Sequence, residues 1–291
     1  ERALDAYEMS LSIVNSLKSE VGRATTLSNL SAILGKMGDV HRYLFDLEGA
    51  LALHARALSI AEYRASGMPA RNWPVYQKLA LSLTKLGNDY HDLGHNDEAL
   101  SLYKRALEIR EDVASQPNRS GADIDLFCSL YKAATTLRIL NRPHEAITMI
   151  ERAIEVIEPV TRETKSVMSR RCLGIGFGEL GVLLRATGNT EDALLAQNQS
   201  VAIHQELAEE SGSITSLHDL SVDYRRIADT YGQLDDLEYA LAYYTKALEV
   251  DETIANNTGN AEALRDLVSS LDRVGNFREQ SGGLCDITFD G

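Results

Sequence analysis

The chain has few of the residues that cross-link, interrupt or anchor a fold. Its 291 residues include only three cysteines, widely spaced and without a C-x-x-C pair, so we expect neither a disulfide framework nor a cysteine zinc site. Only five prolines occur, which leaves long stretches free to form helix. No apolar run is long enough to cross a bilayer, and we expect no signal peptide. These absences favour a helical protein of the reducing cytoplasm.

Positive charge is also scarce. Lysine and arginine number 29 against 43 acidic residues, which gives a net charge of −14. A nucleic-acid partner needs a basic excess to neutralise its phosphates, and an acidic membrane repels an acidic surface. We therefore expect no direct binding of nucleic acid and no membrane attachment.

Motifs of catalysis and cofactor binding are missing or lack their structural context. The sequence has no Walker A, G-x-S-x-G or HExxH motif. A G-x-G-x-x-G spacing runs from Gly176 to Gly181, as in a dinucleotide-binding turn. Such a turn follows a strand, and no strand pattern precedes Gly176. We expect no cofactor, no metal ion and no enzymatic activity.

Small residues recur at a spacing of 47 residues, with one interval of 49. One row consists of alanines: Ala3, Ala50, Ala99, Ala146, Ala193 and Ala240. A second row, here called the seam residues, precedes the last five alanines by twelve positions and then continues once: Gly38, Gly87, Ala134, Gly181, Ala228 and Gly275. A large apolar or aromatic residue stands four positions before each seam residue. Antiparallel helices approach closely where small residues meet and large ones fill the sides, so we predict a series of packed helix pairs.

This pattern resembles the tetratricopeptide repeat. Between residues 81 and 109 the marks of the family stand together at their usual offsets: Leu83, Leu86, Gly87, Tyr90, Ala99, Tyr103 and Ala106. Residues 224–250 repeat them. The usual unit has about 34 residues. The longer spacing resembles kinesin light chains and bacterial multidomain proteins that join such arrays to CHAT (caspase-like), NACHT or TIR domains.

The resemblance implies an all-α, right-handed superhelical solenoid of antiparallel helix pairs, with about twelve helices. We expect the solenoid to occupy residues 1–280, with a half repeat at 1–18, five full repeats within 22–256 and a final helix at 261–279. The full repeats are predicted near 22–64, 75–115, 122–158, 165–209 and 214–256. Trp73, Pro74 and Pro159 are assigned to connections. Residues 281–291 are predicted to be a linker or tail, and both uncapped ends of the array are expected to be contact surfaces.

In this family, ligands lie in a concave groove lined by the first helix of each pair. Counting from the seam residues predicts a peptide- or partner-binding groove formed by Arg42, Asn88, His91, Tyr131, Arg138, Gly178, Arg185, Arg225 and Asp229. A basic residue recurs four positions after the seam residue in four successive pairs. A second row lies two positions before it: Lys36, Lys85, Lys132, Glu179, Arg226 and Arg273. Such rows either bind carboxylates of an acidic segment or pair with acidic residues of adjacent repeats.

Three glycines of the fourth pair lie outside the repeat pattern, apart from Gly35 matching Gly178. Gly174, Gly176 and Gly178 each weaken a helix by about 1 kcal/mol relative to alanine. They predict a soft stretch in which Gly178 leaves bare backbone towards the groove.

Three classes of function remain open from the sequence. The leading hypothesis is a non-catalytic scaffold or sensor that binds a protein or peptide segment, as part of a larger bacterial regulatory protein. One form of it is the regulatory arm of a caspase-like (CHAT) or other effector. A second class is a signalling-peptide receptor that controls transcription, and the third is an enzyme, for which no acid–base or nucleophile constellation is visible.

Overall fold

The computed structural model describes residues 23–68, 72–115 and 121–280, and eleven helices lie in these ranges. Their bounds are α2 Arg23–Tyr43, α3 Leu47–Ser66, α4 Trp73–Asp92, α5 Asn96–Ala114, α6 Ala122–Ile139, α7 Pro143–Thr164, α8 Val167–Ala186, α9 Thr190–Ser211, α10 Ile214–Gln233, α11 Leu237–Thr258 and α12 Ala261–Gln280. No strand occurs among the described residues. The predicted all-α class is confirmed. The half repeat at 1–18 and the tail at 281–291 lie outside the described residues.

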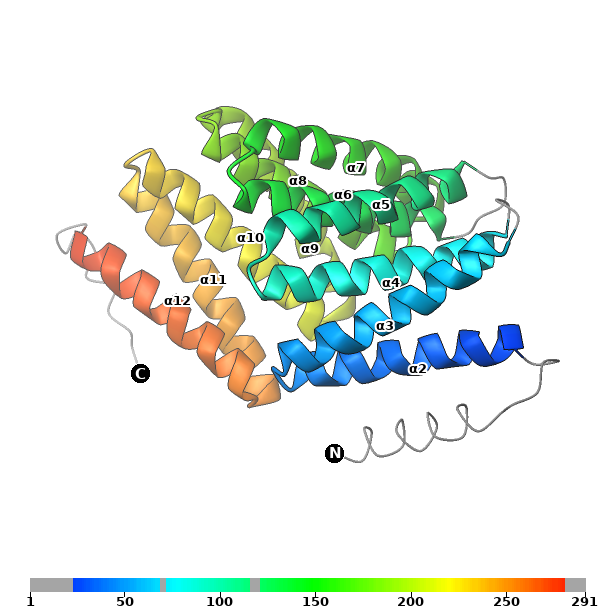
Figure 1. Cartoon of the computed structure of the whole chain (residues 1–291). Helices are drawn as coiled ribbons and strands as arrows, with labels where there is room; N and C mark the ends of the chain where they lie inside the picture. The colour runs from blue at the N-terminus through cyan, green and yellow to red at the C-terminus, as the bar shows by residue number, and fades with distance from the viewer. Residues whose placement is uncertain (1–22, 69–71, 116–120, 281–291) are drawn as a thin grey trace. The chain divides into compact units, whose positions relative to one another are not determined.

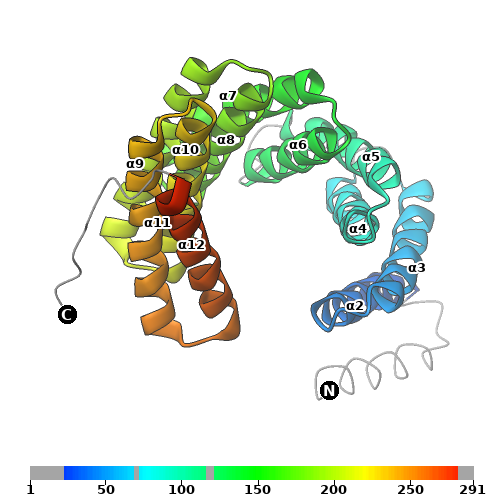
Figure 2. The same cartoon turned by 90° about the vertical axis from the view of Figure 1, so that its left-hand side faces the viewer.

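The chain divides into two compact units, Glu1–Met149 and Ile150–Gly291, and the boundary falls within α7. In the first unit, α2 packs on α3 and α4 on α5; in the second, α8 packs on α9 and α10 on α11. The second helices α3, α5, α9 and α11 also pack on the first helix of the following pair. Figures 1 and 2 show the helices of each unit side by side, as expected for a solenoid of helix pairs.

Local sequence sets several helix starts. Asp46 and Asp236 accept hydrogen bonds from the backbone N–H groups of Gly49 and Tyr239 at the starts of α3 and α11. Ser166 and Ser213 cap α8 and α10 in the same way. Each of these side chains satisfies an amide that has no partner within its helix.

Two prolines assigned to connections lie in helices instead. Trp73 opens α4 and Pro74 lies in its first turn, where a missing N–H group costs nothing. Pro159 lies inside α7, which continues to Thr164. The predicted second helix of this pair was therefore too short at its C-terminal end.

Five of the six seam residues are buried, as the predicted packing requires, whereas Gly275 is exposed and a Cβ atom there would meet nothing within 4 Å. Gly38, Gly87 and Gly181 each face a large side chain of their own partner helix, and a Cβ atom there would collide with it. The side chains concerned are His54, Tyr103 and Gln197. At Gly87 the Cβ would lie 2.7 Å from Cε1 of Tyr103. The alanines Ala50, Ala99, Ala193 and Ala240 are fully buried. Glycine is needed in these three pairs because the facing residue is large.

None of the described helices is long and apolar enough to cross a membrane.

Candidate functional site

Buried polar side chains link successive helix pairs. In each case a residue near the end of a second helix bonds to the first helix of the next pair. Arg110 donates to Ser129, His204 bonds to Asp223 at 2.6 Å, and Asp251 accepts from Ser270 at 2.6 Å. All six residues are buried. These contacts were missed from the sequence, although the residues of each link lie 19 positions apart in all three.

One of these clusters contains the residue types of a catalytic triad but not its geometry. The hydroxyl of Ser200 donates to Asp223 at 2.6 Å, and Nδ1 of His204 bonds to the same carboxylate oxygen. In a triad the serine bonds to the imidazole, which can then take its proton. Here both groups share the carboxylate and all three are buried. The cluster joins helices and has no exposed nucleophile.

A second buried histidine carries a charge. Nδ1 of His54 lies 2.5 Å from Oδ2 of Asp89, and its Nε2 faces the Gly35 carbonyl at 3.0 Å and Asp39 at 3.4 Å. Burial disfavours the imidazolium, but the hydrogen bonds to Asp39 and Asp89 outweigh it and raise the pKa of His54 to about 9. Asp39 also pairs with Lys85. His54 therefore ties α3 to α2 and α4.

The basic row two positions before the seam is engaged with neighbouring repeats. Lys85 pairs with Asp39, and Nζ of Lys132 donates to Oδ1 of Asn88 at 2.9 Å. In the second unit, Arg273 pairs with Asp229 at 3.0 Å and Arg226 with Glu179 at 3.5 Å. Pairing with acidic residues of adjacent repeats accounts for Lys85, Arg226 and Arg273, whereas Lys132 bonds to a neutral amide. Lys36 has no partner in the described part of the chain.

The residues four positions after the seam residues differ from one another in their partners and exposure. Nε of Arg42 donates to Asp92 at 2.5 Å, and this bond, with burial opposing it, raises the pKa of the guanidinium. His91 bonds to Asn96 at 3.1 Å. Arg185 lies 3.9 Å from Asp229, and Arg138 is exposed.

The other predicted groove residues have structural contacts. Asn88 accepts from the Tyr103 hydroxyl as well as from Lys132, so it joins three helices. The ring of Tyr131 stacks on Phe127 with centroids 6.2 Å apart. Arg225 pairs with buried Asp251 at 3.0 Å. Asp229 accepts from the Tyr244 hydroxyl and from Arg273. The predicted set thus divides into Arg42, Asn88, His91, Tyr131 and Arg138 in the first unit and Gly178, Arg185, Arg225 and Asp229 in the second.

The prediction of bare backbone at Gly178 is wrong. Gly178 is buried, and a Cβ there would meet the Arg226 guanidinium and lie 3.0 Å from the Ser200 hydroxyl. Gly174 is buried too, and its Cβ would lie 2.5 Å from Nε2 of His204. Both glycines make room for the polar cluster around Asp223. Packing explains them, and the reason is invisible in the sequence because the other pairs lack this cluster.

The turn between the two helices of each pair has the same form five times. Its central residue has a positive φ and donates its N–H to the carbonyl four positions after the seam. The five residues are Phe45, Gly94, Asn141, Gly188 and Asp235, with φ of 62°, 81°, 56°, 86° and 61°. Glycine, asparagine and aspartate tolerate this conformation, whereas a bulky aromatic residue is strained in it. Phe45 is therefore the outlier, and aligning the turns could have found it.

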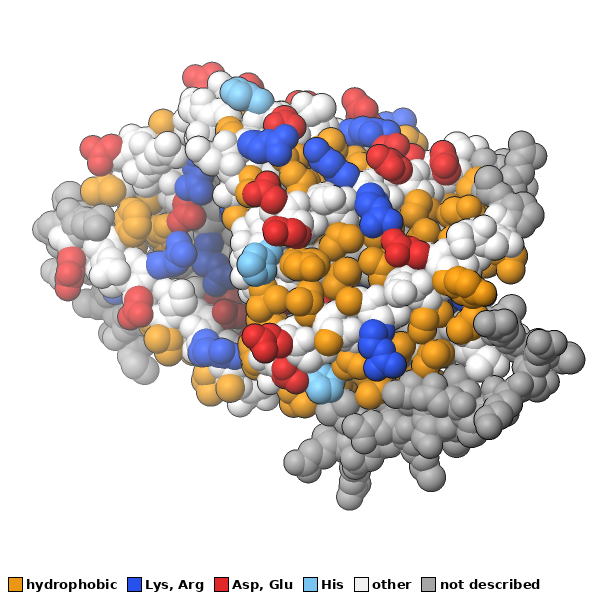
Figure 3. Space-filling model, in the orientation of Figure 1, with side chains coloured by type: hydrophobic (Ala, Val, Ile, Leu, Met, Phe, Trp, Pro, Cys, Tyr) orange, Lys and Arg blue, Asp and Glu red, His pale blue; other side chains and the backbone are white. Residues whose placement is uncertain are grey.

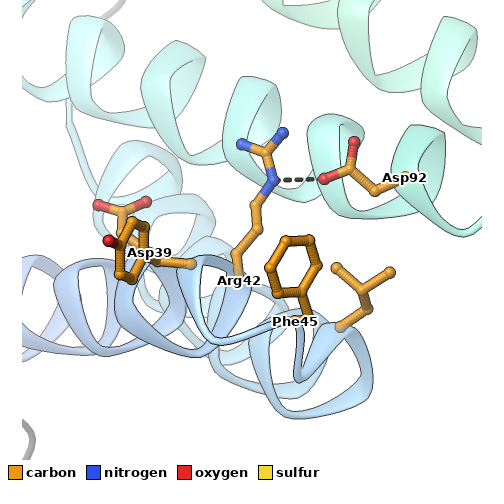
Figure 4. A pocket seen from close by; sticks show the side chains of 6 residues that line it. Asp39, Arg42, Phe45 and Asp92 are labelled. Carbon is orange, nitrogen blue, oxygen red and sulfur yellow. Dashed lines mark hydrogen bonds and ion pairs between the residues drawn. The ribbon is translucent and has the colours of Figure 1, made fainter. Parts of the chain in front are cut away.

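Phe45 lies beside a hollow of about 620 Å³ at the α2–α3 turn, lined by Asp39, Arg42, Tyr43, Phe45, Leu47 and Asp92. Figure 4 shows the ring of Phe45 standing next to the Arg42–Asp92 ion pair. Phe45 is 87% exposed and Tyr43 83% exposed. An aromatic side chain held in a strained conformation while facing solvent gains nothing from burial, which makes this hollow the strongest candidate site.

The wider surface of the first unit is mixed in character. In Figure 3, hydrophobic side chains gather over α3 and α4 and single charged groups interrupt them. Among the described residues, no group of histidine, cysteine or carboxylate side chains could hold a metal ion. The side chains at this surface can therefore bind a partner through apolar contacts and ion pairs.

The fold defines a helical-repeat protein of the α-solenoid class. The family model of the tetratricopeptide repeat matches residues 79–118 and 224–254. These two stretches are therefore tetratricopeptide repeats, and the helix pairs described above continue the same arrangement along the described residues. The resemblance to long-repeat arrays stays a prediction, because neither match tests the length of the unit.

One curated relative has local similarity. Protein NCA1 of Arabidopsis thaliana is 31% identical over 118 residues, which are 39% of this chain and 27% of NCA1. The match thus spans about a quarter of the relative's length.

Solved structures share the fold over much longer stretches. BtubC (BKLC) from P. vanneervenii superposes with a TM-score of 0.61 at 16% identity, over 100% of this chain and 95% of its own. The apo form of RapI gives 0.61 at 12% identity, over 96% of this chain and 76% of its own. Aspartyl phosphate phosphatase F from Bacillus subtilis has a TM-score of 0.58 at 15% identity, over 90% of this chain and 64% of its own. At these identities the likeness concerns the fold.

Proposed function

We propose that this chain is a non-catalytic interaction module that binds a protein or peptide segment on its first-type helices, with an anchor at the Phe45 hollow. The exposure of Phe45 at a position where the other four turns have glycine, asparagine or aspartate carries the proposal. Exposed aromatic and arginine side chains are the residue types that most often dominate the energy of protein interfaces.

The hollow offers two complementary groups to such a segment. Phe45, Leu47 and Tyr43 present apolar surface. Arg42 uses only its Nε atom for Asp92, and its two terminal nitrogens have no partner in the described part of the chain. A guanidinium can bind a carboxylate through two parallel hydrogen bonds. The segment that fits best has a large apolar side chain next to an acidic residue.

The remaining groove residues would extend this contact along each unit. Arg138 is exposed, His91 makes one hydrogen bond at 3.1 Å, and Arg185 lies 3.9 Å from its acidic neighbour. The setting proposed for this module is a bacterial regulatory protein of the cytoplasm, and aspartyl phosphate phosphatase F of Bacillus subtilis shares its fold.

The test is selection of binders from a library of random peptides displayed on phage. We expect the selected peptides to share an acidic residue beside an aromatic or large aliphatic one. Phe45→Gly should weaken a selected peptide at least about tenfold in fluorescence anisotropy, since a lost aromatic anchor costs more than about 1.4 kcal/mol. The same change should leave the fold intact or slightly stabilised, because glycine accepts the positive φ.

A matched control is Tyr63→Ala, which removes an aromatic side chain that is 60% exposed on α3 and does not line the hollow. This variant should bind as the unaltered protein does. If selection enriches no peptide, or if the two variants bind alike, the proposed anchor is wrong.

A further inference from the structure

A smaller hollow of about 190 Å³ lies between α2, α3 and α4 of the first unit, apart from the one at Phe45. Three lysines line it, Lys36 from α2 and Lys78 and Lys85 from α4. Three serine hydroxyls join them, from Ser28, Ser31 and Ser82. Ligand sites for whole small molecules usually measure about 300–1,000 Å³, so this one suits a single chemical group.

The lysines are not all neutralised. Lys85 pairs with Asp39, and the buried His54 at the wall of the hollow pairs with Asp89. Lys78 makes one hydrogen bond, to the neutral Ser28 hydroxyl at 2.7 Å, and Lys36 makes none in the described part of the chain. Among the described residues two positive charges are therefore left over, in a protein whose net charge is −14.

The hollow also has hydrogen-bond donors and free space. Ser31 donates to the Ala57 carbonyl, and the structure gives no protein partner to Ser82 among the described residues. Gly35 borders the hollow, and a Cβ atom there would lie 3.7 Å from Nζ of Lys85, in ordinary contact. Helix packing therefore does not require glycine at position 35. Its lack of a side chain keeps the approach to the lysines open.

We propose that this hollow binds a phosphoryl group. A phosphate monoester carries about −1.5 to −2 charges at pH 7, which matches the two unpaired lysines. Ammonium groups act as point charges on phosphate from several sides, whereas planar carboxylates are better matched by the fork of an arginine. The hollow has lysines on two helices and no arginine among its lining residues.

The group can come from two sources, a phosphorylated side chain of a protein segment or a free small phosphate. Titrations followed by NMR or calorimetry at low salt would use inorganic phosphate, phosphoserine, and a short peptide with and without phosphoserine. Binding of the phosphorylated probes and not of the unphosphorylated peptide is the expected result. Tighter binding of the phosphopeptide than of phosphate identifies a protein segment, and equal binding identifies a free phosphate.

Two variants test the location. Lys36→Gln combined with Lys78→Gln should weaken phosphate and phosphoserine at least about tenfold, because both unpaired charges are removed. Lys104→Gln on α5, outside the hollow, is the control and should change nothing. Gly35→Ala should also weaken binding, because the added methyl group narrows the approach to the lysines. The same change should stabilise α2, since alanine favours helix over glycine.

Absence of binding by any phosphorylated probe at 10 mM, a concentration well above the ~1 mM dissociation constant of a weak site, would overturn the proposal. Equal binding by the double lysine variant and Lys104→Gln would overturn it as well. Phe45→Gly should leave phosphate binding unchanged, so failure of this proposal and failure of the Phe45 anchor can be told apart.

Discussion

At the scale of single residues, His54 is the side chain whose protonation matters most for the fold. It is almost fully buried and bridges Asp39 and Asp89. An unpaired carboxylate in that environment would be costly, so the imidazolium and Asp89 depend on each other. The stability of the first unit should therefore depend on the proton held by His54.

The sign of the resulting pH dependence follows from the raised pKa. In the unfolded chain a histidine has a pKa of about 6.5, and in the fold that of His54 is about 9. The stabilisation is complete below the unfolded value and is lost as the pH rises through the folded one. We predict that the free energy of unfolding falls between pH 7 and pH 9, with a slope of up to about 1.4 kcal/mol per pH unit. Urea unfolding followed by circular dichroism at several pH values measures it.

The comparison that isolates this effect uses two substitutions. His54→Gln should lower stability at pH 7 and remove most of the slope, because no proton is left to lose. His144→Gln, at an exposed position on α7, should keep the slope of the unaltered protein. Parallel slopes in all three proteins would show that His54 is not the titrating group.

At the scale of the helix, two glycines three positions apart in α2 separate helix propensity from packing. A Cβ on Gly35 makes only ordinary contacts, whereas one on Gly38 collides with the ring of His54. That ring is fixed by Asp89 and the Gly35 carbonyl and has no room to swing away. Gly35→Ala should stabilise the protein by up to about 1 kcal/mol. Gly38→Ala should destabilise it by about 1–3 kcal/mol, as overpacked cores do.

Thermal or urea unfolding of the two alanine variants measures the difference. Its sign is the decisive quantity, because the substitutions are chemically identical and share a helix. If Gly38→Ala were as stable as Gly35→Ala, close packing at the seam would not be the reason for glycine there.

At the scale of the whole molecule, the seam pattern was enough to predict the all-α class and the order of the helices. The pattern is local and recurs along the chain, because close packing of two helices requires small residues at the same place in successive repeats. The links at Arg110, His204 and Asp251 could not be predicted in this way, because a different polar pair solves the same problem in each repeat. Only part of the Phe45 hollow could be predicted. Arg42 follows the repeat pattern, whereas Phe45 is unusual only because the other four turns have glycine, asparagine or aspartate at the residue with positive φ.

An array built from neighbour contacts should transmit destabilisation over short distances. In each unit the main contacts join helices that are adjacent in the chain. Ser270 on α12 donates to Asp251 on α11, whose other partner is Arg225 on α10. Ser270→Ala leaves a buried carboxylate with one bond fewer, a loss of about 1–3 kcal/mol. We predict faster amide hydrogen exchange in α10–α12 and unchanged exchange in α2–α4, because repeat arrays open in local segments.

Hydrogen exchange read out by mass spectrometry distinguishes the segments, and the neighbouring residue provides the control. Ser269→Ala removes the same hydroxyl from an exposed position on α12 and should leave exchange unchanged throughout. If Ser270→Ala instead accelerated exchange equally in α2–α4 and α10–α12, the chain would unfold as one cooperative body. The buried polar links would then couple distant repeats rather than only the pairs that they join.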